Sequence, residues 1–488
     1  MSGLVRDQPH HTTTSDERSN AGPGVLPGPF LGGTMSQSLA KLTEMNILKA
    51  IAVVAAPVVL ANLGQTAVEW TTLGMLGTLG AESLAAVGFS RNVFWWATSW
   101  LWAVGMGIMA LVSRSIGAND PERARRTIVQ ALLAGGVITA ATAAIGMGTA
   151  SFALSLLGAE PSVLWLGQPY LRMMFLSAPF MINFHFCVFA LRAMGETQTT
   201  FWLQGIVGVA QLVLSRMLIF GWGPLPALRL VGGGLAIVIS RAIGLVAVLY
   251  VLMSGRSRIR IAPKDLWFRP DWPTISTLFR VSMPNAVEWL GADTQKVILL
   301  RIIASTGAAT FAVSAVTVGR QVEELYGMVG MGLATAAGTL VGQNLGARKP
   351  DRATESANKT STIAIALFAV FGLAFVLLPG RIMRLFCDDI EVIGLGVWYL
   401  RMLGIVGPAY AASIVFAGSL RGAADTRSPM KIALISLWVI QLPLSYFLGL
   451  RTPLSLYGIY LAFAVFWVIQ GIWLKRRFDK GHWKEIAV

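Results

Sequence analysis

Charged residues are scarce in this chain of 488 residues. They make up 13% of the sequence, whereas an ordinary soluble domain carries about 25%. Apolar residues reach 55%, and the mean hydropathy is +0.64. One buried core cannot hide that much apolar surface. The composition therefore excludes a soluble globular domain and indicates a polytopic membrane protein.

The chain also lacks the residues and spacings of most catalytic sites. Its two cysteines, Cys187 and Cys387, are too few for a disulfide framework, so we expect free thiols. There is no metal-ligand spacing, nucleophile elbow or phosphate-binding loop, so we expect no metal, no cofactor and no enzyme activity. The net charge of +15 is assigned to loops that set membrane orientation, and no nucleic-acid partner is expected.

Apolar stretches of about 20 residues or more, the length a helix needs to cross a bilayer, recur along the chain. They predict an all-α protein with twelve transmembrane helices. The expected spans are about 47–75, 82–113, 125–155, 161–192, 197–220, 231–254, 273–302, 310–340, 354–378, 390–420, 428–448 and 455–475.

Basic residues gather in alternate connections, for example Arg123, Arg125 and Arg126 in one and Arg256 and Arg258 in another. The positive-inside rule places these connections and both termini in the cytoplasm, in a multi-pass protein of the plasma (inner) membrane. We expect a disordered tail at 1–45, an N-lobe of six helices at 46–254, a linker at 255–272, a C-lobe of six helices at 273–475 and a second tail at 476–488.

The two halves repeat one another. Tyr170-Leu171-Arg172-Met173 recurs 229 positions later as Tyr399-Leu400-Arg401-Met402, and Gly117-Ala118 recurs as Gly346-Ala347. Upstream the offset is 227, as for Pro57 and Pro284. Each half has an even number of spans, so a pseudo-two-fold axis along the membrane normal should relate the lobes, with the transport cavity between them. Glu196 and Asp425, also a repeat pair, are predicted to cap the helices that follow them.

Several short motifs accompany the repeat: Gln65-Thr66, Gly77-Thr78-Leu79-Gly80, Leu84-Ala85-Ala86-Val87-Gly88, Val341-Gly342-Gln343-Asn344-Leu345-Gly346-Ala347 and Arg421-Gly422-Ala423-Ala424-Asp425-Thr426-Arg427-Ser428-Pro429-Met430. Together they resemble the multidrug and toxic compound extrusion (MATE) family over about residues 46–475. The resemblance implies a two-lobed secondary transporter that exports organic, often cationic, compounds in exchange for H⁺ or Na⁺. Family members often carry an aspartate where this chain has Thr72.

Ionisable groups inside the spans are costly in hydrocarbon, so a functional role is the default interpretation. We expect Glu288 to couple ion and substrate movement, because it lies about one turn past Pro284, where the helix is loosened. Asp293 is the second candidate, since Lys296 three residues later can neutralise it and leaves Glu288 the freer acid. Glu69 is the third, with Thr72 one turn away.

Polar and aromatic residues predict the substrate cavity. Asn62, Gln65, Glu69 and Thr72 share one helical face, which should turn from lipid toward the central cavity or a polar pocket of the N-lobe. The alternative for this face is interhelical hydrogen bonding. Trp95 and Trp96 form either an aromatic wall for planar substrates or ordinary interhelical packing. Gln295 is expected in the same cavity.

Other charges in the spans are assigned to gating or structure. Arg320 precedes Glu323 and Glu324 by three and four residues, which favours pairing within one helix. Arg172 and Arg401 are repeat equivalents in the outer halves of their spans. The loop residues Arg192 and Arg421 are assigned to membrane topology.

The leading hypothesis is a secondary antiporter for organic molecules that works as a monomer among membrane lipids, powered by an ion gradient. A lipid-linked saccharide flippase of the same superfamily is the alternative: it would need more than twelve spans or a strongly cationic cavity, and the arginines inside the spans keep it open. An intramembrane enzyme would need a clustered polar motif, and the sequence has none.

Overall fold

The computed structural model describes residues 42–222, 226–267, 269–306 and 309–486. The first half of the chain forms six long helices: α2 (Ile47–Gly77), α3 (Ala81–Gly117), α4 (Pro121–Leu156), α5 (Pro161–Met194), α6 (Thr197–Phe220) and α7 (Arg229–Met253). The expected tail at 1–45 lies mostly outside the described residues. Within it, Leu42 is buried, and Arg352 donates to the carbonyl oxygens of Leu42 and Met45.

After the short helix η1 (Pro263–Trp267), the second half repeats this pattern. Its long helices are α8 (Trp272–Ala304), α9 (Ala309–Gly346), α10 (Pro350–Leu377), α12 (Ile390–Gly422) and α15 (Leu456–Asp479). A further span is built from α13 (Arg427–Ile435), the π turn η2 (Ser436–Gln441) and α14 (Leu442–Leu450). The short elements α11 (Pro379–Arg384) and η3 (His482–Glu485) complete the half.

The expectation of a twelve-helix, all-α membrane protein is confirmed. Within the described ranges, eleven helical segments are long and apolar enough to cross a membrane. The twelfth is α8, which has 33 residues but carries Glu288, Asp293 and Lys296 in its middle. The two cysteines are free thiols, as expected.

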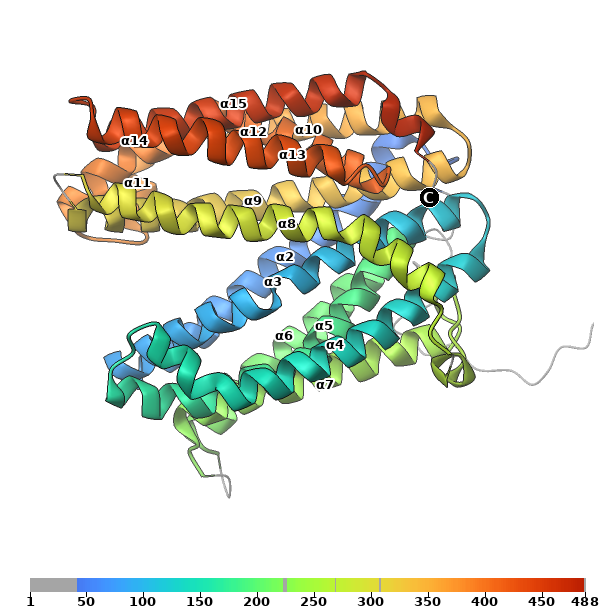
Figure 1. Cartoon of the computed structure of the whole chain (residues 1–488), viewed down its shortest axis with the longest axis horizontal. Helices are drawn as coiled ribbons and strands as arrows, with labels where there is room; N and C mark the ends of the chain where they lie inside the picture. The colour runs from blue at the N-terminus through green and yellow to red at the C-terminus, as the bar shows by residue number, and fades with distance from the viewer. Residues whose placement is uncertain (1–41, 223–225, 268, 307–308, 487–488) are drawn as a thin grey trace, which may run out of the picture. The chain divides into compact units, whose positions relative to one another are not determined.

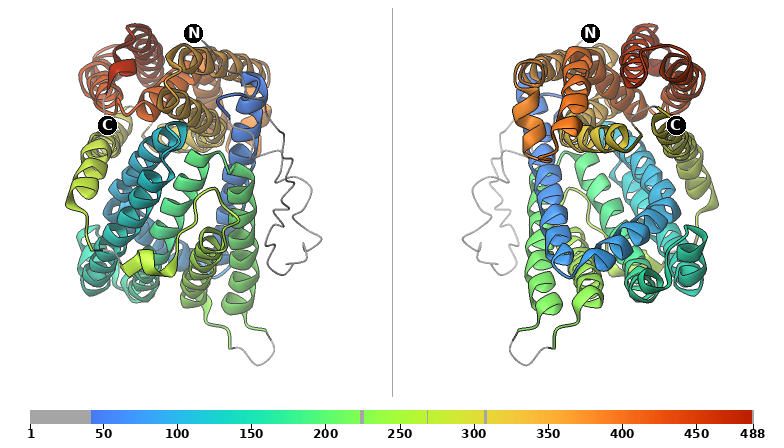
Figure 2. Two further views of the ribbon diagram at one scale, coloured as in Figure 1. Left: turned by 90° about the vertical axis from the view of Figure 1, so that its right-hand side faces the viewer. Right: turned by 90° about the vertical axis from the view of Figure 1, so that its left-hand side faces the viewer.

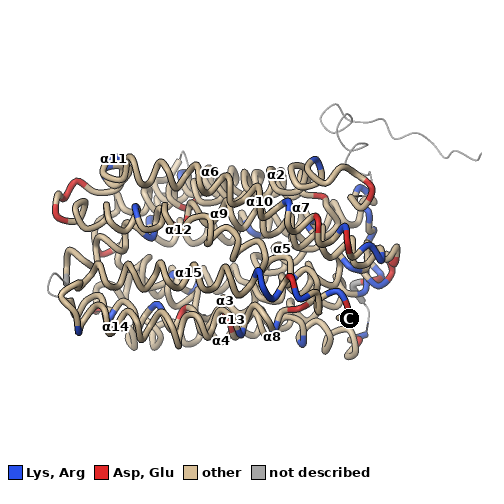
Figure 3. The backbone as a smooth tube through the Cα atoms, turned by 90° about the horizontal axis from the view of Figure 1, so that it is seen from above, with Lys and Arg blue, Asp and Glu red and all other residues tan. Residues whose placement is uncertain are grey.

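The helices lie in two groups, α2–α7 and α8–α15 (Figure 1). The groups meet at one end, which we call the linker end because it holds the inter-lobe connection 254–271 as well as 118–120, 195–196, 347–349 and 423–426. Toward the opposite end, the far end, they diverge (Figure 1). Figure 2 shows the linker end face on in its left view, and Figure 3 shows that Lys, Arg, Asp and Glu concentrate at this end.

The first helix of each half packs against the other half. The first turns of α2, with Ile47 and Ile51, belong to the apolar core of α9, α10, α12 and α15. Reciprocally, Leu278 and Val281 of α8 belong to the core of α3–α7. The lobes therefore exchange equivalent helices at the linker end, which is the arrangement a pseudo-two-fold axis requires.

Candidate functional site

The two lobes touch through a polar contact about midway along α3 and α8. The indole Nε1 of Trp95 donates to Asp293 Oδ2 at 3.1 Å, and Lys296 Nζ lies 2.9 Å from Asp293 Oδ1. The Asp293 side chain is 14% exposed, while that of Lys296 is 54% exposed. Asp293 is thus held by a cation of its own helix and by a donor from the other lobe. Trp96 beside Trp95 is also exposed.

The polar face of α2 turns toward other helices of the N-lobe. Gln65 Nε2 donates to Glu69 Oε1 at 3.1 Å, and Glu69 pairs with Arg91 of α3 at 3.5 Å. Asn62 Oδ1 accepts a hydrogen bond from Arg192 of α5 at 3.4 Å. Thr72 is buried, and its hydroxyl donates to the carbonyl of Val68 within α2. Interhelical bonding therefore accounts for Asn62 and Glu69.

Glu288 is not the freer acid that its spacing suggested. Its Oε1 lies 2.6 Å from Arg421 Nη2, and both side chains are nearly buried, at 12% and 13% exposed. Arg421 also donates through Nε to Asn285 Oδ1 at 3.1 Å. The expectation that Glu288 lacks a counter-ion was wrong. Arg421, 133 residues away in the chain, lies at the end of α12 and packs inward against Glu288. Arg421 and the buried Arg192, which were predicted only to set membrane topology, therefore also bind side chains inside their lobes.

Two further expectations are corrected by packing. Gln295 is 2% exposed, and its amide meets Gln441 of η2 at 3.3 Å, so it belongs to the C-lobe interior rather than to a cavity wall. Among the residues the structure describes, no carboxylate lies within ion-pair distance of Arg320. Glu323 instead accepts a 2.5 Å hydrogen bond from the Tyr399 hydroxyl, because this face of α9 is turned to α12.

The remaining predicted charges lie toward the far end. Arg172 of α5 donates to the carbonyl of Met147 in α4 at 3.2 Å. Its repeat equivalent Arg401 lies over the ring of Trp398, 5.3 Å from the centroid. Both contacts hold the guanidinium within its own lobe, and neither joins the two lobes.

A cavity of about 430 Å³ lies between α8 and α9. Its polar lining comes from Lys296, Arg320, Gln321 and Glu324, and Leu300 contributes to its apolar wall. The volume is within the range of small-molecule pockets, which are mostly apolar with a few polar groups. Because Lys296 also holds Asp293, this cavity adjoins the contact between the lobes.

At the linker end, α3 and α9 cross in close contact at two glycines that occupy equivalent positions of the repeat. A Cβ on Gly117 of α3 would collide with the main-chain oxygen of Gln343, and a Cβ on Gly346 of α9 would collide with that of Arg114. Gly117 and Gly346 are a repeat pair, as are Arg114 and Gln343. The pseudo-two-fold axis therefore passes through this crossing, where two backbones touch.

Side chains of α9 also satisfy the last carbonyls of α5, which the helix itself leaves without partners. Gln343 Nε2 donates to the carbonyl of Ala193 at 2.7 Å, and Thr339 Oγ1 to that of Arg192 at 3.2 Å. Gln343 belongs to the Val341–Ala347 motif, so a structural reason for part of that motif is its contact with the end of α5. These bonds join the lobes at the linker end.

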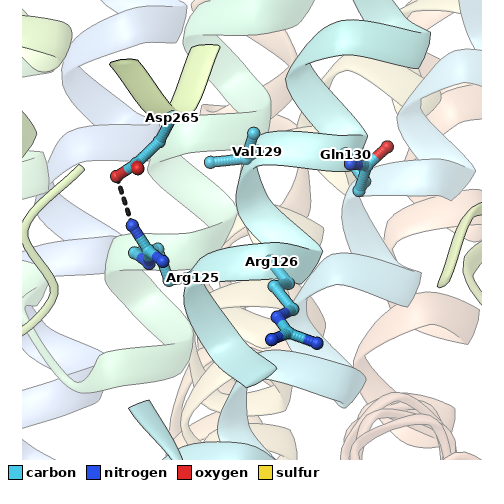
Figure 4. A pocket seen from close by; sticks show the side chains of 5 residues that line it. All are labelled: Arg125, Arg126, Val129, Gln130 and Asp265. Carbon is cyan, nitrogen blue, oxygen red and sulfur yellow. Dashed lines mark ion pairs between the residues drawn. The ribbon is translucent and has the colours of Figure 1, made fainter. Parts of the chain in front are cut away.

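An ion pair and several hydrogen bonds fasten the inter-lobe linker to the N-lobe. Asp265 forms an ion pair with Arg125 of α4, and hydrogen bonding from Arg125 lowers the pKa of Asp265 (Figure 4). Near the linker start, Glu196 accepts from Ser257 Oγ at 2.9 Å and from the Arg258 amide at 2.7 Å. Glu196 therefore holds the linker instead of capping α6 with its side chain, and burial raises its pKa.

Comparison with known proteins settles the family. The MatE family model matches residues 57–217 and 296–447, one block in each lobe. This chain belongs to the MATE family. It is a multi-pass membrane transporter and not an enzyme.

Relatives of this MATE chain cover nearly its whole length. It is 26% identical over 438 residues to the multidrug resistance protein NorM of Aliivibrio fischeri, covering 86% of this chain and 93% of that protein. It is 26% identical over 402 residues to an FAD transporter of Shewanella oneidensis, covering 81% and 86%. The structure of a MOP superfamily transporter from Pyrococcus furiosus shares its fold, with a TM-score of 0.83 at 20% identity over 90% and 98% of the two chains.

Proposed function

We propose that this MATE chain exports organic, cationic or amphipathic small molecules in exchange for H⁺, or for Na⁺, by rocking its two lobes. The names of its relatives, multidrug resistance protein NorM and an FAD transporter, support export of organic molecules. The observation that carries the coupling proposal is Asp293, a carboxylate of the C-lobe that accepts a hydrogen bond from Trp95 of the N-lobe.

Coupling requires that ion and substrate favour different states of one bistable element. Ionised Asp293 accepts from Trp95 and pairs with Lys296, so it favours the state in which α3 and α8 touch. Protonation removes its charge and weakens both bonds. We therefore place Asp293 ahead of Glu288, whose charge is engaged by Arg421 inside one lobe. Glu69, paired with Arg91 at the same depth, is the second acid.

The linker end is proposed to face the cytoplasm, because charged residues, including the basic 254–271 connection, gather there (Figure 3). The lobes meet at this end and diverge at the other, so the conformation is assigned as outward-facing. The protein is proposed to work as a monomer in the plasma membrane, with both termini inside.

The test is ethidium efflux from proteoliposomes under an imposed pH or Na⁺ gradient. Asp293→Asn keeps the shape of the side chain but cannot ionise, so gradient-driven efflux should be lost while the purified protein stays folded. Asp388→Asn, an exposed carboxylate at the far end, is the matched control and should transport normally. Efflux driven by ATP alone would contradict the proposal. So would movement of a lipid-linked saccharide with no cation transport.

A further inference from the structure

The cavity between α8 and α9 contains a guanidinium, that of Arg320, which has no carboxylate at ion-pair distance among the described residues and is attracted to Glu323 only at longer range. Glu323 is bound to Tyr399, and Glu324 lies on the cavity wall beyond ion-pair distance. An unpaired cation within a membrane span is costly, so such residues normally face a partner or a functional cavity.

The arginine of the N-lobe that is equivalent to Arg320 does have an acidic partner. Arg91 of α3 is the equivalent of Arg320, 229 positions earlier, and it pairs with Glu69 of α2 at 3.5 Å. The residue equivalent to Glu69, 227 positions later, is Lys296. The N-lobe thus supplies its arginine with an acid from the chain. In the C-lobe the equivalent position holds a second cation, Lys296. Lys296 forms its own ion pair with Asp293.

The shape of the cavity indicates what could supply the missing anion. Arg320 presents a planar fork of donors suited to carboxylate and phosphate oxygens, and Lys296 adds a half-exposed ammonium group. Leu300 and Val316 provide an apolar wall, which a hydrated inorganic ion would not use. Glu324 on the same lining repels negative charge, so an anionic group is confined to the side of Lys296 and Arg320.

We infer that this cavity is a subsite for the carboxylate or phosphate group of an exported amphipathic molecule, held by Arg320 and Lys296 with its apolar body against Leu300 and Val316. The inference rests on the proposed export function and extends it to a second class of substrate, amphipathic molecules that carry an anionic group. The affinity of the protein for such anionic molecules should fall as the salt concentration rises, because salt screens the charge attraction that contributes to binding.

The probe is carboxyfluorescein, with ethidium as a planar cation of opposite charge. Binding to purified protein in lipid-free detergent is followed by fluorescence polarisation. Arg320→Gln should weaken carboxyfluorescein binding at least tenfold and leave ethidium binding unchanged. Arg320→Lys, which keeps the charge without the fork, should lie between Arg320→Gln and wild type. Arg301→Gln, an exposed arginine on α8 outside the cavity lining, is the matched control and should bind like wild type.

Several results would overturn the inference: no carboxyfluorescein binding by the wild type, or equal binding by wild type and Arg320→Gln once a thermal unfolding curve shows that the variant is folded. Transport separates the possible sources of the anion. Gradient-driven efflux of carboxyfluorescein supports a substrate site, whereas displacement by phosphatidylglycerol without any efflux would mean a lipid site and reject the inference. If the wild-type protein transports no ethidium, that result counts against the proposed function alone. The inference is tested separately, by carboxyfluorescein binding in detergent.

Discussion

Arg192 and Arg421 occupy the same position in the two repeats, and each anchors the first helix of its own lobe. Arg192 reaches Asn62 of α2, and Arg421 reaches Asn285 of α8. Only the C-lobe adds an acid, Glu288, at 2.6 Å. The repeat therefore keeps the cation, which bonds an asparagine at a different position of the first helix in each lobe, and the charge balance differs between the lobes.

The buried pair predicts a stability effect. Glu288→Gln leaves Arg421 buried without a counter-charge, which should lower the free energy of unfolding by about 3 kcal/mol. The double variant Glu288→Gln/Arg421→Gln should recover most of that loss, because no charge remains buried. Glu355→Gln breaks the exposed Glu355–Lys359 pair and should change stability by less than about 1 kcal/mol. Unfolding in detergent by denaturant measures all three, and equal losses for Glu288→Gln and Glu355→Gln would refute the assignment.

At the scale of helices, the crossing of α3 and α9 decides how closely the lobes approach. Gly117 and Gly346 let the two backbones touch, and Thr339 and Gln343 then reach the end of α5. Glycine is needed at these two positions because a side chain would collide with the facing helix. It is not needed for its backbone conformation, since both glycines end ordinary α-helices. Closure of the linker end depends on the absence of a methyl group at two equivalent points.

Gly346→Ala should therefore hold the linker end open. The added Cβ meets main-chain atoms of α3 that cannot move independently, so the closed state is destabilised and ethidium efflux should fall at least tenfold. Thiol labelling of Thr339→Cys from the linker side, in a Cys387→Ser background, should rise in the same variant. Gly148→Ala, in open space on α4, is the control. Unchanged labelling and efflux in Gly346→Ala would show that closure does not need this contact.

At the scale of the whole molecule, the segment after α15 connects the lobes. Trp483 is 1% exposed, stacks on Phe478 at 4.6 Å and donates to its carbonyl at 2.7 Å. This seats the segment on the C-lobe, where the Ile486 carbonyl accepts a 2.7 Å hydrogen bond from Arg114 of α3. Residues 481–486, part of the segment predicted as a C-terminal tail at 476–488, thus join both lobes at the linker end.

Trp483→Ala should release this connection. Removing a fully buried tryptophan costs about 3–5 kcal/mol where the site cannot collapse, which is enough to detach a short segment. Labelling of Thr339→Cys should then increase several-fold, and a tag placed after Val488 should be cleaved faster by protease. Trp165→Ala, at a position that is 79% exposed, should change neither readout. Equal labelling in the two variants would mean that the segment only covers the C-lobe.

The spans, the repeat and the family resemblance can all be read from the amino-acid sequence. A membrane span is a local property, because about 20 consecutive apolar residues must satisfy their own backbone as a helix. Even α8 was located, since Pro284 and the basic residues before it mark its place in the repeat. The repeat then predicted an axis between the lobes, whereas the meeting of Gly117 and Gly346 near that axis is seen only in the packing of α3 on α9.

The pairing of charged and polar side chains depends instead on how the helices pack. Within one helix, spacing correctly indicated Asp293 with Lys296, but of the two partners that it suggested for Arg320, Glu323 bonds Tyr399 of another helix and Glu324 stays beyond ion-pair distance. Glu288 with Arg421, Gln295 with Gln441 and Trp95 with Asp293 join residues more than 100 positions apart. Such partners depend on the rotation of each helix about its axis. That rotation is set by packing against all its neighbours at once, and no single stretch of sequence contains it.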